Sequence, residues 1–514
     1  MRFSIIDCYT DEPSGLGVMP YIGTYPRYIF GAITKCRAEC HYLTIDDIRS
    51  IFKKSDIEHD MRTNISVRNL TPNNPMVGEI LRKSDVIIVI SGLHTPGKYL
   101  SAYPGTTVEV RKLFERLGIG EKFKILTGPA ATAGSGMFGG RMARSAEGED
   151  DFFNLIVPEL EYRLDGLLES NFTDVPGVED KYARLREIAP LGAAIVPQLP
   201  YDPSFHIAEL ETMSGCAKEV PCSFCVEKIK SKEVARRQPR DIIEEASALS
   251  RFGIRNFRVG KQTCIYSYGS NEDLKELFRP LSEISKVLHI DNANPLFVTE
   301  EKTRTLVEYC SPGNVASLGV ESFDPKVIKQ NELKNDPEGI YGVIELINRL
   351  GSVKGGNGMP MLLPGVNILF GLEGESKNTH SENMAWLKRI YEDGLLLRRI
   401  NIREVVIFPG TSLSKRAGNK YLRKNRKYYW KWRNDIRSNI DQPMLERLLP
   451  KGSVLRSLRT EVYDGKTTFA RQVGSYPIIA GISGRIGLDR IIDARVVGHM
   501  RRSVVAEEVP HSIG

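Results

Sequence analysis

Glu209-Leu-Glu-Thr-Met-Ser-Gly-Cys216 is followed by Ala-Lys-Glu-Val-Pro and then by Cys222-Ser-Phe-Cys225. The stretch opens as a strand, and its three cysteines share the loop that follows. Thiolate is the ligand that iron–sulfur clusters use, so this loop can hold three corners of a four-iron cluster and leave the fourth iron open. A four-thiolate zinc site needs another cysteine nearby, and the nearest in sequence is Cys264. The alternatives to a cluster are an incomplete zinc knuckle or three buried thiols.

The bulk composition is that of an ordinary globular protein with more than one domain. A chain of 514 residues is long enough for two or three domains, each with its own core. It has no run of about twenty apolar residues, and its N-terminus begins as a strand rather than as a signal peptide. Eight cysteines in so long a chain make no disulfide framework. We therefore expect a cytoplasmic protein that binds no membrane.

The N-terminal part alternates apolar strands with helices. The expected strands are 3–6, 41–44, 85–91 and 123–127, with a helix at 107–117. Because these strands do not alternate polar and apolar residues, they predict a parallel sheet covered on both faces. Parallel sheets bind ligands beyond the carboxyl ends of their strands, where Ser91–Gly97 and Gly128–Thr132 lie. Glycines at such ends allow close approach to a bulky ligand, and simple tight turns are the alternative.

A second series of strands and helices begins at Ile207. Pro190–Pro203 carries prolines without helical or strand periodicity, so we expect a connector and the domain boundary there. The expected helix is 241–251, and the expected strands after the cysteine loop are 255–260, 289–294, 316–321, 367–371 and 402–408. Repeats of this kind predict an incomplete parallel barrel with its chemistry at the C-terminal rim.

A basic segment and a β-rich tail close the chain. Between Lys415 and Arg437 there are ten Lys or Arg residues and one acid, which gives a local charge of +9. With the interleaved tyrosines and tryptophans, such a segment binds nucleic acid or simply forms an amphipathic helix whose lysines stay in water. We favour the amphipathic helix. Residues 452–505 then predict a small barrel, with strands at 467–472, 477–482 and 494–498.

The cysteine loop resembles the signature of the radical S-adenosylmethionine (SAM) superfamily. Three cysteines bind iron there, and an aromatic residue, here Phe224, precedes the last of them. The first gap differs from the usual pattern, with five intervening residues instead of three. Val315–Ser322 and Asn367–Glu375 resemble two later strands of the family, in the family's order. The resemblance implies that Cys216, Cys222 and Cys225 ligate the cluster, that Phe224 packs beside the adenine of SAM, and that Gly260, Ser317, Glu321 and Gly371 hold its ribose and amino-acid end.

A parallel sheet ahead of such a barrel resembles the cobalamin-dependent radical SAM methyltransferases. The chain lacks their Asp-x-His-x-x-Gly motif, because Gly92 stands where the aspartate would precede His94. Relatives without that histidine also hold cobalamin. The resemblance implies a cobalamin site made by Gly17, Tyr21, Ser91, Gly92, His94, Thr95, Gly128, Pro129 and Thr132.

The expected fold is therefore α/β, with a Rossmann-like cobalamin-binding domain, a partial (β/α)6 radical SAM barrel and a small C-terminal β-rich domain. The expected boundaries are 1–190 for the cobalamin-binding-like domain, 204–412 for the barrel, 413–450 for the basic-aromatic helical segment and 451–514 for the β-rich domain.

Three longer stretches resemble archaeal fusions of a cobalamin-type domain to a radical SAM core: Cys8–Tyr21, Arg398–Arg403 and Arg471–Pro477. Within that set, the altered cysteine spacing resembles the methanogen enzymes that C-methylate a glutamine of methyl-coenzyme M reductase. This implies a 5′-deoxyadenosyl radical that abstracts hydrogen and a methyl group handed over from methylcobalamin. The implied partners are the α subunit of methyl-coenzyme M reductase as protein substrate and a ferredoxin or flavodoxin as reductant.

Two other functions stay open. The basic segment and the terminal barrel fit a radical SAM enzyme that methylates or thiomethylates tRNA. Methylthiotransferases usually carry a second cluster on three N-terminal cysteines, and only Cys8, Cys36 and Cys40 are available here, so we expect no second cluster. The second of these alternatives is a non-catalytic iron–sulfur protein.

Overall fold

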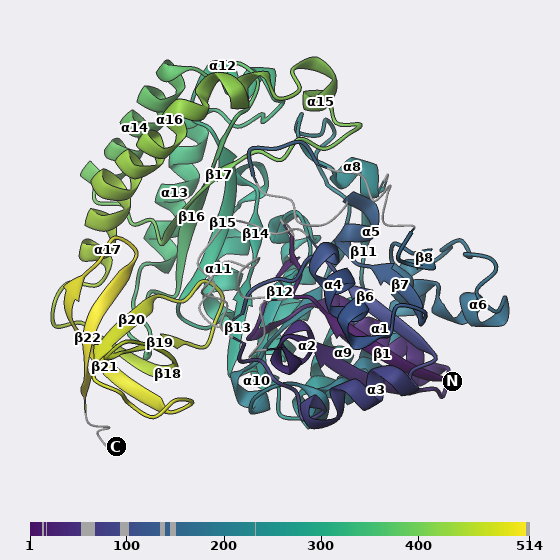
Figure 1. Ribbon diagram of the computed structural model, residues 1–514. Helices are drawn as coiled ribbons and strands as arrows, with labels where there is room; N and C mark the ends of the chain where they lie inside the picture. The colour runs from purple at the N-terminus through teal and green to yellow at the C-terminus, as the bar shows by residue number, and fades with distance from the viewer. Residues whose placement is uncertain are drawn as a thin grey trace. The chain divides into compact units, whose positions relative to one another are not determined.

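The computed structural model describes residues 1–12, 15–16, 18–52, 67–92, 102–133, 139–143, 151–231 and 233–509 (Figure 1). The chain divides into two compact units, and each is described by itself. The first contains residues 1–138, 143–211 and 240–255, and the second contains 139–142, 212–239 and 256–514. Among the described residues no helix is long and apolar enough to cross a bilayer.

The first unit is built on a five-stranded parallel sheet, as the sequence predicts. The strand order is β5-β1-β6-β7-β8. The strands are β1 (Arg2–Asp7), β5 (Glu39–Thr44), β6 (Val86–Ile90), β7 (Phe123–Thr127) and β8 (Leu155–Ile156). Every residue of β6 is buried, because helices cover both faces of the sheet. All pairings in this sheet are parallel, so the carboxyl ends of its strands share one edge.

Short strands and eight helices complete the first unit in the described residues. The short strands are β2 (Asp11–Glu12), β3 (Gly15–Leu16), β4 (Tyr21–Ile22) and β9 (Ile207–Glu211), and β4 pairs in parallel with β9. The helices are α1 (Thr24–Lys35), α2 (Ile45–Ile51), α3 (Val77–Lys83), α4 (Thr107–Leu117), α5 (Pro129–Ala133), α6 (Leu164–Glu169), α7 (Lys181–Leu191) and α9 (Pro239–Arg251). The 3-10 helices are η2 (Asn74–Met76), η3 (Leu160–Tyr162), η4 (Gly192–Gln198) and η5 (Pro203–Phe205).

The segment 190–203, predicted as a connector without regular structure, is helical over most of its length. α7 runs through Pro190, and η4 follows it directly. A 3-10 helix has no 3.6-residue period, so the apolar pattern did not reveal it. This segment packs tightly on α1, since a Cβ on Gly192 would lie 2.2 Å from the carbonyl oxygen of Arg27 and one on Gly31 would lie 2.0 Å from that of Ile188.

The second unit contains parallel strands with intervening helices, in agreement with the predicted partial barrel. The strands are β12 (Asn256–Gly260), β13 (Val287–Ile290), β14 (Asn292–Ala293), β15 (Asn314–Glu321), β16 (Leu362–Phe370) and β17 (Arg399–Glu404). The pairs β12–β13, β14–β15, β15–β16 and β16–β17 are all parallel. The helices are η6 (Ile265–Ser267), α10 (Asn271–Ile284), η7 (Pro295–Phe297), α11 (Glu300–Tyr309), α12 (Pro325–Gln330), α13 (Pro337–Gly351) and α14 (Lys377–Glu392). In Figure 1, α13 and α14 lie along one face of β15–β17.

Three strand predictions in this unit need correction. The strand expected at 367–371 is β16, which begins five residues earlier, at Leu362. The strand expected at 289–294 is two strands, β13 and β14, which are interrupted at Asp291. The strand expected at 402–408 is β17, which begins and ends earlier. In β17, Ile400 and Ile402 are buried while Arg399, Asn401 and Arg403 on the other face are half-buried. Because those polar residues interrupt the apolar run, the apolar pattern does not give the correct bounds of the strand.

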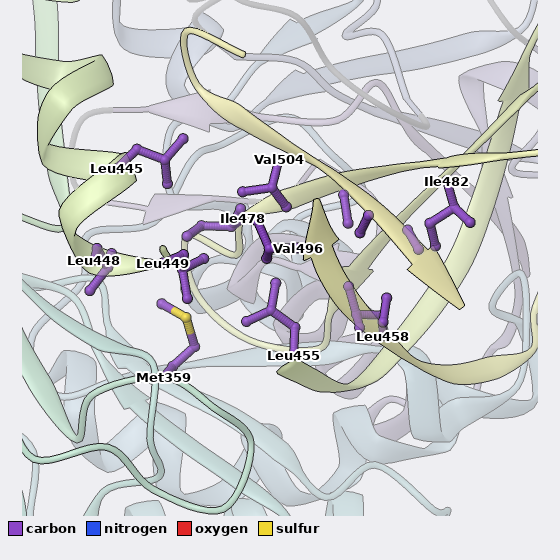
Figure 2. Close-up of a cluster of buried hydrophobic side chains, with 14 of the residues drawn as sticks. Met359, Leu445, Leu448, Leu449, Leu455, Leu458, Ile478, Ile482, Val496 and Val504 are labelled. Atoms are coloured by element: carbon purple, nitrogen blue, oxygen red, sulfur yellow. The ribbon is translucent and has the colours of Figure 1, made fainter. Parts of the chain in front are cut away.

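The C-terminal part carries the predicted helical segment and the predicted small barrel. The helices are α15 (Ser412–Arg416), α16 (Lys420–Ile436), the π-helix η8 (Arg437–Asp441) and α17 (Gln442–Leu448). The barrel strands are β18 (Val454–Asp464), β19 (Thr467–Gln472), β20 (Ile479–Ser483), β21 (Ile491–His499) and β22 (Ser503–Val509), closed in the order β18-β19-β20-β22-β21. Figure 2 shows its core, where Leu455, Leu458, Val496 and Val504 pack with Leu445 and Leu449 of the α17 region.

Candidate active site

The cysteine loop lies within the second unit, between two short antiparallel strands. β10 (Met213–Ser214) pairs with β11 (Ala235–Arg236), and the loop between them also contains α8 (Glu227–Lys230). Gly215 opens the loop with a φ of +80°, and a Cβ there would lie 2.4 Å from the carbonyl oxygen of Glu233. Thr263 Oγ1 donates to the carbonyl oxygen of Gly215 over 3.1 Å. Only glycine fits at position 215, so the backbone conformation at the start of the loop is fixed.

A buried asparagine anchors the middle of the loop. Ser223 N donates to Asn331 O over 3.0 Å, and Ser223 Oγ donates to Asn331 Oδ1 over 2.7 Å. Asn331 ends α12 and is fully buried, and its Nδ2 donates to Glu373 O over 2.9 Å. Leu413 N donates to Ser223 O over 2.8 Å. Ser223, between Cys222 and Phe224, is thus tied directly to two separate segments of the unit, and through Asn331 to a third.

The three thiols are half-buried and influence one another electrically. The pKa of Cys225 is raised to about 12, mainly by burial and to a smaller extent by the charges of Glu227 and of the other two thiols. Burial also raises the pKa of Cys222, while Lys218 lowers it; the Lys218 ammonium lies 3.1 Å from the Cys222 sulfur. Thiols that interact in this way repel once they are deprotonated, and a bound cation relieves that repulsion.

The donor set suits a four-iron cluster better than a single metal ion. Among the described residues, no group of three or more His, Cys, Asp or Glu side chains has the geometry to hold one ion. A four-iron cluster makes a different demand, because each ligand sulfur binds a separate iron and the sulfurs do not converge on one point. Three thiols on one pinned loop fit that demand.

Phe224 belongs to the cysteine loop, and Glu321 is near enough for its charge to raise the pKa of Cys222. Phe224 is half-buried and packs against an apolar cluster; its members are Val327, Leu372, Val405, Ile407, Leu413 and Leu422. Glu321 ends β15 with a φ of +63°, after a shift in the β15–β16 register. Burial raises the pKa of Glu321 to about 7, against the lowering effects of Arg403 and Lys218. An acid with such a pKa exchanges a proton near neutral pH.

Three other residues predicted to hold SAM already have partners in the protein. Gly260 accepts a hydrogen bond from Thr212 Oγ1 over 3.5 Å at the end of β12. Ser317 is buried on β15, and its Oγ accepts from Asn367 Nδ2 over 3.5 Å. Gly371 donates its N–H to Glu375 Oε2 over 2.7 Å. The N–H of Gly371 is therefore bound to the protein itself.

A polar row crosses the strands between these positions, and the sequence analysis did not identify it. Register pairs align Asn292 with Ser317 and Asn367 with Asn401. Asn401 Nδ2 donates to Asn367 Oδ1 over 3.2 Å, and Asn292 Nδ2 donates to Gln262 O over 3.4 Å. The alternation Arg399-Ile-Asn-Ile-Arg403 was the available signal, since every second residue of a strand shares one face.

A second missed group joins the parallel strands to the loop between β19 and β20. Tyr476 OH donates to Asp291 Oδ1 over 2.7 Å and accepts from Arg258 Nη2 over 2.9 Å. Arg258 also pairs directly with Asp291, and the Arg399 guanidinium lies 4.2 Å from the centre of the Tyr476 ring. Burial raises the pKa of Tyr476 to about 12, so the hydroxyl keeps its proton. The C-terminal part thereby supplies a side chain to the partial barrel.

Cys264 and the glycines at 139–140 have local roles in the second unit. Cys264 is buried, and its sulfur accepts a hydrogen bond from Asn294 N over 3.1 Å. Gly140 N donates to Val405 O over 3.0 Å, and a Cβ on Gly139 would lie 2.7 Å from Glu404 O. These glycines allow the backbone to run close beside the segment that follows β17.

The first unit brings together several of the residues predicted for cobalamin. Ser91 and Gly92 follow β6, and Gly128 and Pro129 follow β7 at the same edge of the sheet. Gly128 has a φ of +80°, and a Cβ there would lie 2.8 Å from Ser91 O. Thr132 is exposed on α5, and Tyr21 is buried in β4. Gly17, His94 and Thr95 lie outside the described residues.

Two hydroxyls at this edge have no hydrogen-bond partner among the described residues. They are Ser91 Oγ, after β6, and Thr127 Oγ1, at the end of β7, and both side chains are fully buried. The two strand ends are adjacent, since Ser91 N donates to Thr127 O over 3.1 Å. A buried hydroxyl without a partner is costly, so a ligand that pairs with it is stabilised.

Comparisons with known proteins show the family of the chain. Residues 210–368 match the radical SAM superfamily. An uncharacterized protein of Methanocaldococcus jannaschii is 40% identical over 99% of this chain and 93% of its own length, and one of Archaeoglobus fulgidus is 37% identical over 99% and 90%. The radical S-adenosylmethionine methyltransferase TsrM of Kitasatospora setae shares the fold at 14% identity, with a TM-score of 0.52 over 78% of this chain and 72% of that one.

The chain is a radical SAM enzyme. It belongs to the radical SAM superfamily, in one family with the two archaeal proteins. Membership implies a four-iron cluster and SAM as cofactors, and the thiols of the cysteine loop are suitable ligands for that cluster.

Proposed function

We propose that this protein is a cobalamin-dependent radical SAM C-methyltransferase, that its target is an unactivated carbon, and that its substrate is a glutamine of methyl-coenzyme M reductase. The observation that carries the proposal is the combination of the pinned cysteine loop with a sheet edge that holds two buried hydroxyls, Ser91 and Thr127, for which the described part of the chain offers no hydrogen-bond partner. TsrM, which has the same fold, is named as a radical SAM methyltransferase.

Each cofactor has a proposed set of residues. Cys216, Cys222 and Cys225 would hold the cluster, and Phe224, Gly260, Ser317, Glu321 and Gly371 would contact SAM. Tyr21, Ser91, Gly92, Gly128, Pro129 and Thr132, with Gly17, His94 and Thr95, would contact cobalamin. When bound, these cofactors supply one-electron chemistry and a transferable methyl group.

The protein itself would bind and orient the substrate and exclude water from the site. The polar row from Asn292 to Asn401 supplies donors and acceptors for a polar substrate, because its amides are only half-buried. Tyr476 joins Asp291 and Arg258 in a buried network of charged and hydroxyl groups. Glu321, with its pKa near 7, is able to hold or release a proton beside the cysteine loop.

The proposed partners are the α subunit of methyl-coenzyme M reductase and a ferredoxin or flavodoxin that delivers the electron. The substrate is tested with a glutamine peptide from the α subunit and with the same peptide carrying asparagine in its place. A mass gain of one CH2 group on the glutamine peptide alone supports the proposal. Equal methylation of both peptides, or of neither, contradicts the glutamine assignment.

The reaction class has a separate test. Protein purified anaerobically with iron, sulfide and cobalamin should carry corrinoid absorption bands beside those of the cluster, and should release 5′-deoxyadenosine from SAM after reduction. Cys216→Ala, Cys222→Ala and Cys225→Ala should each abolish that release, whereas Cys36→Ala, equally half-buried in the first unit, should retain it. A non-catalytic iron–sulfur protein would release none in any variant.

A second candidate is a radical SAM enzyme that modifies tRNA. The observation that favours it is the exposed cationic face of α16, formed by Arg423, Lys424, Arg426 and Lys427. Phosphate attraction is strongest at low salt, so tRNA binding that is lost on neutralising these four residues would support the candidate. Absence of binding at low salt would remove it.

A further inference from the structure

Lys218 is a buried cation inside the cysteine loop. It lies in the five-residue segment between Cys216 and Cys222, and only 4% of its surface is exposed. Its Nζ donates to Cys222 Sγ over 3.1 Å, to Glu332 O over 2.7 Å and to Leu333 O over 3.2 Å. An ammonium has three N–H donors, so every one of them has an acceptor.

The acceptors come from a turn with unusual backbone geometry. Glu332 and Lys334 both have left-handed φ values, +55° and +63°, although neither is glycine. Residues other than glycine adopt such a strained conformation only where the surrounding structure demands it. The turn directs two successive carbonyl oxygens, of Glu332 and Leu333, at the same ammonium. Buried charges need partners of this kind.

The Lys218 charge therefore faces Cys222 in a defined geometry. Two carbonyls fix the ammonium, and the third donor is left for the sulfur. A positive charge beside a cluster favours the state with one more electron, and hydrogen bonds to ligand sulfur raise the reduction potential in the same direction. The segment that lengthens the first cysteine gap is the segment that carries this lysine.

We propose that Lys218 is a positioning residue that raises the reduction potential of the cluster through its hydrogen bond to the Cys222 sulfur. The inference rests on the proposed cluster and deepens it. It assigns a purpose to the long gap: a three-residue gap would leave less chain from which to bring a lysine back onto the second cysteine. Lys218 does not contact substrate in this role.

The test is a redox titration of the full chain after anaerobic cluster assembly, followed by electron paramagnetic resonance of the reduced cluster. Lys218→Met removes both the charge and the donor. At the midpoint potential of the unaltered protein, its ratio of reduced to oxidised cluster should fall about tenfold, which for a one-electron couple is about 59 mV. Lys218→Arg keeps the charge and should retain most of the wild-type potential. Lys388→Met removes the same charge from an exposed position on α14 and should leave the potential unchanged.

The outcomes separate this inference from the proposed function. If the unaltered protein holds no four-iron cluster, the proposed function fails. If all variants hold four irons and Lys218→Met titrates with the unaltered protein, the inference about Lys218 is overturned. Should Lys218→Met lose iron, Lys218→Gln decides, because it keeps an N–H donor without the charge. A lowered potential with full iron content in that variant supports the proposal, and loss of iron in the Met, Gln and Arg variants alike overturns it.

Discussion

The position directly after β16 requires a glycine, Gly371, because no side chain fits there. Its φ is +94°, and a Cβ would lie 2.3 Å from Leu422 Cδ2. For Gly371→Ala we expect a loss of about 1–2 kcal/mol from the left-handed backbone and about 1–3 kcal/mol from overpacking. All three tryptophans lie in the second unit, so tryptophan fluorescence during urea unfolding measures that unit.

The matched control for Gly371 is Gly342→Ala on α13. Apart from the local backbone of α13, no heavy atom of the described residues lies within 4 Å of a Cβ at Gly342, and alanine favours a helix by roughly 0.5–1 kcal/mol over glycine. This variant should unfold at the same or a higher urea concentration than the unaltered protein. Equal midpoints for the Gly371 and Gly342 variants would contradict the steric argument.

Glu375 makes the stability of the second unit depend on pH. The side chain is 1% exposed, and burial raises its pKa from 4.5 to about 7 in the folded protein. Between these two values the folded state holds a proton that the unfolded state has released, so the free energy of unfolding falls as pH rises. The stabilisation is complete below about pH 4.5 and lost above about pH 7, a change of about 3 kcal/mol.

Glu375→Gln should lack that change. The amide cannot accept from both Gly371 N and Asn425 Nδ2 as the carboxyl does, but this defect costs the same at every pH. The difference in unfolding free energy between the unaltered protein and the variant should therefore shrink by about 3 kcal/mol from pH 4 to pH 8. The exposed Glu283→Gln on α10 is the control and should follow the unaltered protein. A constant difference for the Glu375 variant would refute the assignment.

At the scale of elements, α16 has one apolar face and one cationic face. Trp432 is 4% exposed and stacks on Tyr428 and His380 with ring centres 5.5 Å and 5.4 Å apart, whereas Trp430 is 63% exposed. We expect Trp432→Ala to destabilise the second unit by about 3–5 kcal/mol, and Trp430→Ala by less than about 1 kcal/mol. Hydrogen exchange along α16 measures both. Similar exchange rates in the two variants would show that this face does not hold the helix in place.

Helices and strands were predicted accurately from the sequence where a local sequence signal marks their ends or their buried face. α4 has the predicted bounds, because Thr106 caps its first turn and Gly118, with a φ of +64°, ends it. β17 was misplaced because its half-buried face is polar, and 190–203 was missed because 3-10 turns lack the helical period. Periodicity identifies an element when one face is uniformly apolar.

The candidate site shows the same dependence on local signals. The three cysteines lie close enough in the sequence to be recognised by their spacing, and Lys218 lies between the first two. Its partners Glu332 and Leu333 are more than a hundred residues away, and Tyr476 lies 185 residues beyond Asp291. Contacts of this kind depend on how the strands are ordered, which the pattern of apolar residues does not specify.

At the scale of the whole molecule, the chain passes more than once between its two compact units. Residues 240–255, which include most of α9, belong to the first unit although they follow the cysteine loop. The α/β class and the C-terminal barrel were predicted correctly, but the return of residues 240–255 to the first unit was not. One of the contacts that hold α9 there is a buried ion pair that no local pattern reveals: Arg27 on α1 with Glu245 on α9, both fully buried.

That ion pair should decide whether α9 stays on the first unit. Arg27 also donates to Gly23 O over 3.3 Å, and Tyr28 OH donates to Glu245 Oε2 over 3.3 Å. Glu245→Ala leaves the guanidinium buried without its counter-ion, and breaking such a pair costs about 3–5 kcal/mol. Hydrogen exchange of β1 and α1 should therefore accelerate, while tryptophan fluorescence of the second unit during urea unfolding should not change. The exposed Glu244→Ala, one residue earlier, is the control. If both variants exchange alike, another contact holds α9; if Arg27→Met combined with Glu245→Leu restores slow exchange, the loss came from the unpaired charge, as expected when apolar side chains replace a buried pair.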